Sequence, residues 1–482
     1  MEVLQRTANR GSISTGYDID NSLKLNSASS EYLYITRDAS GSDWNRLLWT
    51  ASMWVKHIPT ESSATSPKER MFGAADAQSD FDIRFRGQPI GFRNNSDVDG
   101  VAELRTTAVY RDYSSWYHVV AVWDTANGTA GNRMRLYVNG EEVTSFSTDT
   151  QPSQNEKSIW GKKNDGTDGD VAHTIGAYYN ASSGFAQGFN GYMAEVHWVE
   201  GAALAPTEFG EVDSASGIWK PKEADVTYGT NGFYLNFDDS SALGADSSGN
   251  SNNWSLNNIA AADQATDTPT NNFCTFNAVN MSGSSAKLAE GATFTASTAN
   301  GAFTTYGTMA PSSGKWWWEG KIQVFESGST YACIGATTNL AGLPSVSAQL
   351  SGGHVIKLAK NQKWVLNSTG YTYGATYADA DIINVGLDLD NRKFYTYKNG
   401  TIDDANGIDI SSSTFDGFGS QWMPLVITYG SGGASSYEIN FGGYRTYGIG
   451  SPQSDGNGYG TFEYAPPSGY YALCTKNLAE FG

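Results

Sequence analysis

The chain has little charge for its size and no basic cluster. Charged residues make up 17% of its 482 residues, whereas globular proteins usually contain roughly 25%. The 31 Lys and Arg residues are outnumbered by 50 Asp and Glu residues, which gives a net charge of −19. Nucleic acids and anionic membranes are bound through clustered basic side chains. We therefore expect neither of them as a partner.

Cysteine and long apolar segments are also scarce. The three cysteines, Cys274, Cys333 and Cys474, are far apart and odd in number, so they are expected to be buried free thiols rather than a disulfide framework. The opening MEVLQRTANR lacks the apolar segment of a secretory signal. No stretch approaches the roughly 18 apolar residues that span a bilayer. These absences predict a protein made in a cytoplasm without membrane insertion.

What the chain does contain is glycine, with 54 residues, and segments that alternate between apolar and polar side chains. In FDIRFRG, Phe81, Ile83 and Phe85 fall on one side and Asp82, Arg84 and Arg86 on the other. This period of two predicts β-strands with one buried face. LAPTEFGEV is the one segment that suggests a short helical turn. The pattern predicts an all-β fold of two antiparallel β-sandwich, jelly-roll-like domains in tandem.

Two Asn-Gly pairs, Asn139-Gly140 and Asn399-Gly400, each follow an alternating run that ends in YVNG or YKNG. Asn-Gly tolerates a positive φ at both central positions of a type I′ turn. Each half of the chain is therefore expected to contain one tight hairpin at this pair.

The first half resembles the concanavalin A-like, laminin-G-type jelly roll. The matching segments are NSLKLNSASSEYLYIT, WTASMWVK, WYHVVAVWD, NRMRLYVNGEEV, HTIGAYY and FNGYMAEVHWVEG, which cover most of residues 20–205. FYLNFDDSSALGADSSGNSNNW (233–254) looks like the strand and turn that normally begin such a domain, yet here it follows the other strands. The resemblance implies a circular permutation. Residues 231–258 are expected to add a strand to the first sandwich.

The second half resembles a SPRY domain over about residues 286–445. The matching segments are GKWWWEGKI, IGAT, DIINVGLDLDNRKFYTYKNG and MPLVITYGSGGASSYEINFGG. The expected organisation is an N-terminal arm at 1–17, a permuted jelly roll at 18–262, a linker at 263–285, a SPRY-like sandwich at 286–450 and a C-terminal tail at 451–482. The arm is expected to contact other subunits or virion proteins rather than its own sandwich.

These two domains with the ending PPSGYYALCTKNL resemble structural proteins of tailed bacteriophages. The resemblance implies a virion surface protein of the tail-fibre or receptor-binding type, whose sandwich loops bind a host-surface glycan or protein. The alternative is a structural capsid or tail decoration protein that contacts other virion proteins. Both imply a virion location and a homo-oligomer with other virion proteins as partners. Tail or capsid location and the identity of the ligand stay open.

Catalysis has weak support in the sequence, although glycan hydrolases share the jelly roll. Retaining glycosidases need two carboxylates about 5 Å apart. Glu211 and Asp213 lack the further Glu of that pattern, and Glu195 and Glu200 have an odd spacing that points them to opposite faces. The five histidines form no HxxxH or HxH pair, so zinc is not indicated. We expect a protein that is not an enzyme and has no cofactor.

Loop aromatics are the candidate binding residues. Trp160 lies in SIWGKKNDG, and Tyr371, Tyr373 and Tyr377 lie in TGYTYGATYADAD. Exposed rings would give flat faces for sugars or anchors for protein contacts, and packing against their own sandwich is the alternative. In the DSSGN turn, Asp246 and Asn250 offer hard oxygen ligands that suit calcium. A plain Asx-type turn is the favoured alternative there.

Overall fold

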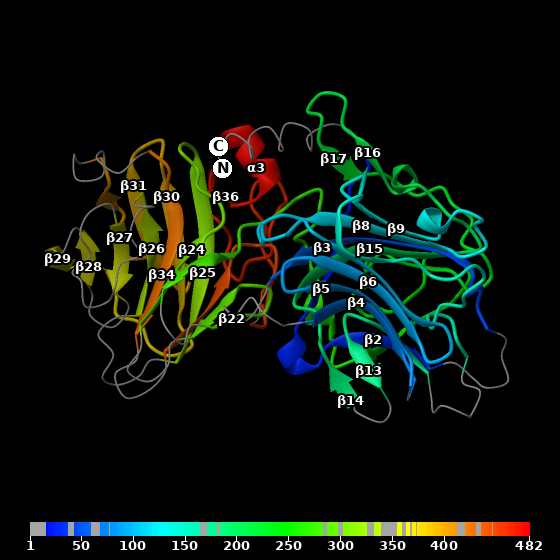
Figure 1. Ribbon diagram of the computed structural model, residues 1–482. Helices are drawn as coiled ribbons and strands as arrows, with labels where there is room; N and C mark the ends of the chain where they lie inside the picture. The colour runs from blue at the N-terminus through cyan, green and yellow to red at the C-terminus, as the bar shows by residue number, and fades with distance from the viewer. Residues whose placement is uncertain are drawn as a thin grey trace. The chain divides into compact units, whose positions relative to one another are not determined.

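The computed structural model describes residues 16–36, 43–58, 68–76, 78–163, 171–180, 184–282, 287–296, 302–324, 332–338, 354–358, 363–366, 369–372, 374–411, 420–429, 435–445 and 447–482. The chain divides into two compact units, the first ending at Thr270 and the second beginning at Asn271. Both are built almost entirely from antiparallel strands (Figure 1). No helix in the part of the chain described has the length and apolar character needed to cross a bilayer.

Two sheets face each other in the first unit (Figure 1). Sheet 1 has, in spatial order, β10 (Glu141–Glu142), β9 (Met134–Val138), β8 (Tyr117–Asp124), β3 (Leu48–His57), β15 (Gly191–Glu200), β1 (Ser22–Leu25) and β20 (Gln264–Ala265), with β18 (Phe233–Leu235) also paired to β15. Sheet 2 has β11 (Phe146–Thr150), β7 (Gly100–Thr106), β6 (Ile90–Ser96), β5 (Asp80–Arg86), β4 (Lys68–Ala75), β12 (Ala172–Ile175), β2 (Tyr32–Thr36) and β19 (Ser255–Asn257).

The remaining elements of the first unit are short. They are the hairpins β13 (Tyr178–Asn180) with β14 (Gly184–Ala186) and β16 (Gly210–Val212) with β17 (Trp219–Pro221), and the 3₁₀ helices η1 (Ser27–Ser29), η2 (Ala130–Asn132), η3 (Pro206–Glu208) and η4 (Ala261–Asp263). The helical turn expected in LAPTEFGEV is η3, so that prediction is confirmed.

The core of the first unit lies between its two sheets. Apolar side chains that alternate along the strands fill it, among them Trp49, Met53, Val119, Leu136, Phe72, Phe92 and Leu104. Phe81, Ile83 and Phe85 of β5 belong to this core, as the alternation predicts. A period of two therefore leaves the intervening polar residues of β5 on the outer face of sheet 2.

Residues 231–258 complete both sheets of the first unit, as expected. β18 pairs with β15, with Trp198 opposite Phe233. β19 pairs with β2, with Leu256 opposite Leu33. Strands that come late in the sequence thus lie beside much earlier ones. β19 follows its partner β2 by more than 200 residues.

The prediction that residues 263–285 form a linker is wrong. Ser22 and Leu23 of β1 pair with β20, which lies inside that range. Its other end contributes β21 (Phe276–Ser282), which pairs with β24 (Ala302–Gly307) of the second unit. Polar side chains of this segment form buried ion pairs, such as that of Asp267 with Lys56. Its polar composition therefore does not indicate a solvent-exposed linker.

The second unit also has two sheets. Sheet 3 comprises β21 (Phe276–Ser282), β24 (Ala302–Gly307), β34 (Met423–Tyr429), β26 (Ala332–Thr337), β27 (His354–Leu358), β28 (Lys363–Leu366) and β29 (Thr369–Thr372). Sheet 4 comprises β22 (Lys287–Ala289), β23 (Phe294–Ala296), β35 (Ser436–Asn440), β25 (Lys315–Val324), β30 (Ile382–Asp388), β31 (Lys393–Lys398) and β32 (Thr401–Ile402), with β33 (Ile408–Asp409) on β31 and β36 (Tyr471–Ala472) on β25.

Both predicted Asn-Gly hairpins are confirmed. Asn139 and Gly140 join β9 to β10 with φ values of 50° and 82°. Asn399 and Gly400 join β31 to β32 with φ values of 49° and 77°. The positive φ at both central residues is the geometry that makes Asn-Gly the preferred pair.

Residues 451–482, expected as a tail, form part of the second unit. β36 pairs in parallel with Trp316 and Trp317 of β25, and the helix α3 (Thr475–Phe481) follows it. Trp317 packs with Phe462 and Tyr470 of this segment. The segment therefore covers one face of β25 with apolar side chains, which is why its sequence is rich in aromatics. α3 was not predicted, because two turns are too short for a clear helical period.

Candidate functional site

Trp160 lies in the core of the first unit, so the prediction that it is an exposed loop aromatic is wrong. Its side chain is 1% exposed. Its ring centroid is 6.2 Å from that of Trp44, 6.5 Å from that of Trp198 and 6.2 Å from that of Trp254. Polar residues next to Trp160 in the sequence suggested a loop, but its packing partners come from distant segments.

The structure does not show an exposed surface formed by the loop tyrosines Tyr371, Tyr373 and Tyr377 either. Tyr377 is 5% exposed, and its hydroxyl donates to Asp403 Oδ2 at 2.7 Å. Lys398 Nζ lies 5.7 Å from the centre of its ring. Tyr377 therefore fastens its loop to β31 and β32 and offers no open face. Tyr373 and the side chain of Tyr371 lie outside the described residues.

Asp246 has the geometry of the plain turn. Its Oδ1 accepts from the backbone N–H groups of Tyr234 and Ser248, and its Oδ2 accepts from the backbone N–H of Asn252. The Asn250 side-chain amide donates to backbone carbonyls, including that of Gly232 at 2.9 Å. N–H donors thus surround the carboxylate that calcium would need. Within the described residues, no group of three or more His, Cys, Asp or Glu side chains is placed to hold a metal ion.

Glu195 and Glu200 have separate surroundings. Glu195 accepts from the hydroxyls of Tyr17 and Tyr234 at 2.9 and 2.6 Å. Glu200 accepts from the backbone N–H groups of Asn45 and Asn231 at 2.7 and 2.9 Å. Each carboxylate thus fastens a different segment. Tyr17, the last residue of the expected arm, therefore contacts the first sandwich itself, contrary to that expectation for this residue. Residues 1–15 of the arm lie outside the described residues.

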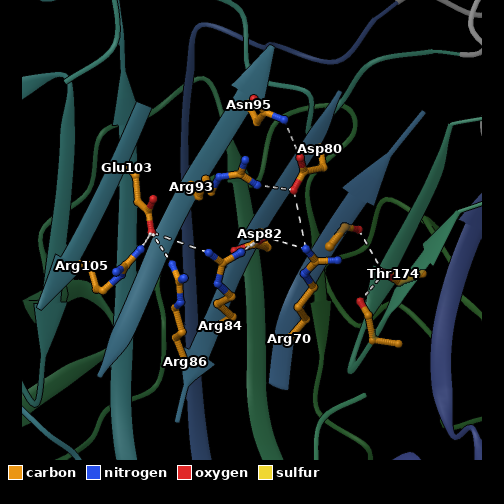
Figure 2. A network of polar contacts seen from close by, with 12 residues as sticks. Arg70, Asp80, Asp82, Arg84, Arg86, Arg93, Asn95, Glu103, Arg105 and Thr174 are labelled. Atoms are coloured by element: carbon orange, nitrogen blue, oxygen red, sulfur yellow. Dashed lines mark hydrogen bonds and ion pairs between the residues drawn. The ribbon is translucent and has the colours of Figure 1, made fainter. Parts of the chain in front are cut away.

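The outer face of sheet 2 instead carries a dense set of charged side chains (Figure 2). We call it the charged face, and it comprises Arg70 of β4, Asp80, Asp82, Arg84 and Arg86 of β5, Arg93 of β6, and Glu103 and Arg105 of β7. These residues alternate with core residues along their strands. Strand pairing, rather than loop conformation, therefore fixes their positions.

Three arginines of the charged face lie in one row across the strands. Arg70 is opposite Arg84, Arg84 is opposite Gly91, and Gly91 is opposite Arg105. The row continues to Thr148 of β11. Like charges directly opposite each other on neighbouring strands are destabilising. Cross-strand pairing alone therefore does not favour such a row. Residues that break a rule of strand pairing in this way often belong to functional sites.

Acidic side chains beside this arginine row offset part of the repulsion (Figure 2). Asp82 is ion-paired with Arg84 and, at 3.0 Å, with Arg70. Asp80 Oδ2 is 2.5 Å from Arg93 Nη1. Burial raises the pKa of Asp82 and lowers the pKa of Arg70. Arg70, Asp82 and Arg84 thus form a buried ion-pair network, with side chains at most 3% exposed.

The part of the charged face next to β7 has more arginines than carboxylates to pair with them. Glu103 Oε1 lies 2.6 Å from Arg105, 3.6 Å from Arg84 and 3.6 Å from Arg86. One carboxylate is therefore shared by three guanidinium groups. The pKa of Arg86 is lowered, first by desolvation and then by the positive charges of Arg105 and Arg84. Across the whole charged face five arginines stand against three acids, an excess of two positive charges.

Several guanidinium nitrogens of the charged face lack a partner among the described residues. They are Nε and Nη1 of Arg70, Nε of Arg84 and Nε of Arg105. The Arg70 guanidinium is covered by the ring of Tyr178, 3.7 Å away, which belongs to the β13–β14 hairpin. Arg86 and Arg105 are reachable, with side chains 41% and 25% exposed.

Sequence reasoning placed part of the charged face correctly but did not recognise it as a site. The alternation in FDIRFRG puts Asp82, Arg84 and Arg86 on one side. The same alternation occurs in GVAELRT (100–106), a signal in the sequence that was not used and that puts Glu103 and Arg105 on one side. The missing information was the register between strands, because only pairing brings Arg84 and Arg105 to either side of Gly91.

Comparison with known proteins gives a family for part of the first unit. Residues 27–208 match the sequence model of the concanavalin A-like lectin/glucanases superfamily. The matched range contains β2 to η3, including all four strands of the charged face, and ends before β18 and β19. The first unit therefore carries a concanavalin A-like domain. No curated protein sequence matches the chain.

Solved structures with similar folds share little sequence with this chain. The SPRY domain of human HERC1 is 16% identical, with 33% of this chain and 92% of that chain covered and a TM-score of 0.27. The SAP-like pentraxin of Limulus polyphemus is 14% identical, covering 39% and 80%, with a TM-score of 0.26. The CBM40 of the Ruminococcus gnavus IT-sialidase is 15% identical, covering 39% and 93%, with a TM-score of 0.26.

Proposed function

We propose that the concanavalin A-like unit binds a host-surface ligand through the charged face, and that the chain is a non-enzymatic surface protein of a phage virion. The observation that carries the binding proposal is the charged face itself. It combines reachable arginines with strands held by a packed core, so its groups are already positioned before a ligand arrives. A preorganised face loses less conformational entropy on binding than mobile loops do.

The carboxylates of the charged face favour binding over hydrolysis. A retaining glycosidase needs one reachable nucleophile and one reachable acid. Asp82 is fully buried, while Asp80 and Glu103 are ion-paired with arginines. Their oxygens are thus bound to guanidinium groups and are not free to attack a sugar or to protonate a leaving group. These carboxylates therefore hold the guanidinium groups in place.

The virion assignment rests on the sequence resemblance to structural proteins of tailed phages, in which a jelly roll, a SPRY-like sandwich and the PPSGYYALCTKNL ending occur together. On this proposal the partners are other virion proteins and further copies of the chain. Multiple copies would raise a weak single-site affinity by roughly 10²–10⁴ where the geometry permits. Such avidity suits a shallow sheet face better than a deep pocket.

Competition for adsorption tests this function. The purified full chain, added to host cells before the phage, should slow phage adsorption. The double variant Arg86→Gln/Arg105→Gln should not, whereas Arg111→Gln, which changes an exposed arginine in the loop between β7 and β8, should compete like the parent protein. Competition that persists in the double variant would place the site elsewhere. No competition by the parent chain would favour the decoration role.

A further inference from the structure

The arginine row of the charged face has a gap at its centre. Arg84 and Arg105 each stand opposite Gly91, so their Cα atoms are two strand spacings apart, roughly 9–10 Å. Glycine places no side chain between them. A Cβ at Gly91 would lie 3.7 Å from Cγ and Nε of Arg84, so the Arg84 stem lies along one side of this gap. Gly91 is itself buried, so the side chains around it, the Arg84 stem among them, cover this strip of backbone.

The reachable arginines beside the gap lack sufficient acidic partners. Arg86 Nη1 is 3.6 Å from Glu103 Oε1, which exceeds hydrogen-bonding distance. Arg105 Nη2 holds that same oxygen at 2.6 Å. An additional anion between Arg86 and Arg105 would satisfy donors that one glutamate cannot. A carboxylate matches the planar guanidinium fork, which can bind it through two parallel hydrogen bonds.

Hydroxyl-bearing and acidic groups surround this position. Thr148 is opposite Arg105, and Thr150 is opposite Glu103, both on the edge strand β11. Glu103 also supplies acceptor oxygens beside this position. Acceptor carboxylates suit sugar hydroxyls, which donate hydrogen bonds.

On the basis of the function proposed above, we infer that the charged face is specific for an acidic polysaccharide, whose sugar carboxylates bind Arg86 and Arg105 beside Gly91. The polymer runs across the strands in the direction of the arginine row. Its hydroxyl groups meet the Glu103 carboxylate and the edge strand β11. Carboxylates carried on hydroxyl-rich rings match the cations and acceptors of this face.

Polygalacturonate and its fully methyl-esterified form are matched probes, because they differ in charge but not in backbone. The full chain should bind immobilised polygalacturonate and bind the ester at least tenfold more weakly. Arg86→Gln and Arg105→Gln should each weaken binding to polygalacturonate by roughly tenfold to a hundredfold, the usual range for a hydrogen bond to a charged group. Arg111→Gln is the matched control and should leave binding unchanged.

A variant at the gap gives a test that keeps every charge. Gly91→Val places a branched side chain between Arg84 and Arg105 and should weaken polygalacturonate binding while thermal unfolding shows the first unit still folded. If that variant unfolds, the Arg86→Gln and Arg105→Gln variants alone test the inference. Both arginine side chains are partly exposed, so these substitutions should leave the first unit folded. Raising the salt concentration should weaken binding of the parent chain and have less effect on the variants.

The outcomes separate this inference from the function on which it rests. Equal binding of acid and ester, with loss in the Arg variants, would refute carboxylate specificity and leave glycan binding in place. Binding of poly-glutamate but not of polygalacturonate, abolished by Arg86→Gln, would assign the face to an acidic protein and overturn the polysaccharide inference. Self-association lost in the same variant would assign it to a second copy of this acidic chain. Adsorption competition without any binding to either form of the polymer would also overturn it.

Discussion

Lys56 of β3 and Asp267, 211 residues later, form an ion pair with Nζ and Oδ2 2.7 Å apart. Their side chains are 0% and 1% exposed. Asp267 Oδ1 also accepts from the indole N–H of Trp116 at 3.1 Å, and its backbone carbonyl accepts from Ser22. This one residue therefore ties the segment after β20 to three other parts of the first unit.

Asp267→Asn should destabilise the first unit by about 3–5 kcal/mol, because it removes the negative charge that is ion-paired with the buried Lys56 ammonium. The free energy of unfolding, measured by urea denaturation of the full chain, should show a loss in the transition of the first unit. Glu211→Gln is the control. It removes a partner of Lys220 from a pair whose side chains are 50% and 23% exposed, and it should cost at most about 1 kcal/mol. Equal effects of the two substitutions would contradict the role given to burial.

His57 and Glu69 form a second buried pair, in which His57 Nε2 contacts Glu69 Oε2 and Asn190 donates to Glu69 Oε1. Burial lowers the pKa of His57 to about 3 and raises the pKa of Glu69 to about 8. Both side chains are thus neutral near pH 6. The Glu69 carboxyl then donates its proton to the imidazole.

These directions predict how stability depends on pH. The folded-state pKa of Glu69 is above its unfolded value of 4.5, so its contribution is present below pH 4.5 and is lost as pH rises through about 8. The folded-state pKa of His57 is below 6.5, so its contribution is present above pH 6.5 and is lost as pH falls through about 3. The two slopes cancel between pH 4.5 and 6.5, and stability should fall on either side.

Glu69→Gln isolates the alkaline part of this profile. Glutamine can donate to His57 and accept from Asn190, as the neutral acid does, so the variant should match the parent near pH 5.5. From pH 6.5 to 8 the parent should lose about 2 kcal/mol that the variant keeps, at about 1.4 kcal/mol per pH unit. Chemical denaturation across this range measures the difference. Glu141→Gln, at an exposed position of β10, should behave like the parent, and parallel profiles for all three proteins would refute a neutral pair.

Glu319 in β25 holds the C-terminal segment onto sheet 4. Its side chain is fully buried and accepts from the backbone N–H groups of Glu463 and Tyr464, each at 2.9 Å. Asn384 and Tyr447 donate to the same carboxylate. Asn440 donates to it as well, at 3.3 Å. The carboxylate can accept these five hydrogen bonds because both of its oxygens are acceptors.

Glu319→Gln should release this segment, because an amide group replaces one acceptor oxygen with a donor facing other donors. The expected cost is about 2–4 kcal/mol for buried donors left unpaired. Hydrogen exchange of the Glu463 and Tyr464 amides should become faster, while strands of the first unit keep their protection. Glu480→Gln changes an exposed partner of Asn457 and should leave those amides protected. Unchanged exchange in Glu319→Gln would show that Trp317 and its apolar neighbours hold the segment without the carboxylate.

Local pattern was enough to predict the strands and their faces. The core positions of Phe81, Ile83 and Phe85 follow from alternation alone, and the Asn139-Gly140 turn follows from the φ values that only a few residues tolerate. The place of β18 in sheet 1 followed from a family resemblance that showed a strand out of order. These features depend on short segments or on a known strand order.

Features that depend on pairing between distant segments were not predictable. Trp160 has polar neighbours in sequence, and only the packing of Trp44, Trp198 and Trp254 around it shows that it is buried. Asp267 lies in a segment with the composition of a linker, and its lysine partner is on β3. The arginine row needs the register of four strands, which composition does not contain.

The pairing of β1 with β20 sets an order of events during synthesis of the chain. A ribosome adding roughly 5–20 residues per second makes β20 roughly 12–50 s after β1. Until β18 and then β20 have been made, the edges of β15 and β1 that they cover stay open. Open edges can pair with other chains. The nascent first unit is therefore exposed to misassembly for most of its translation, and it becomes a closed, cooperatively folding body only as the first strand of the second unit is being made.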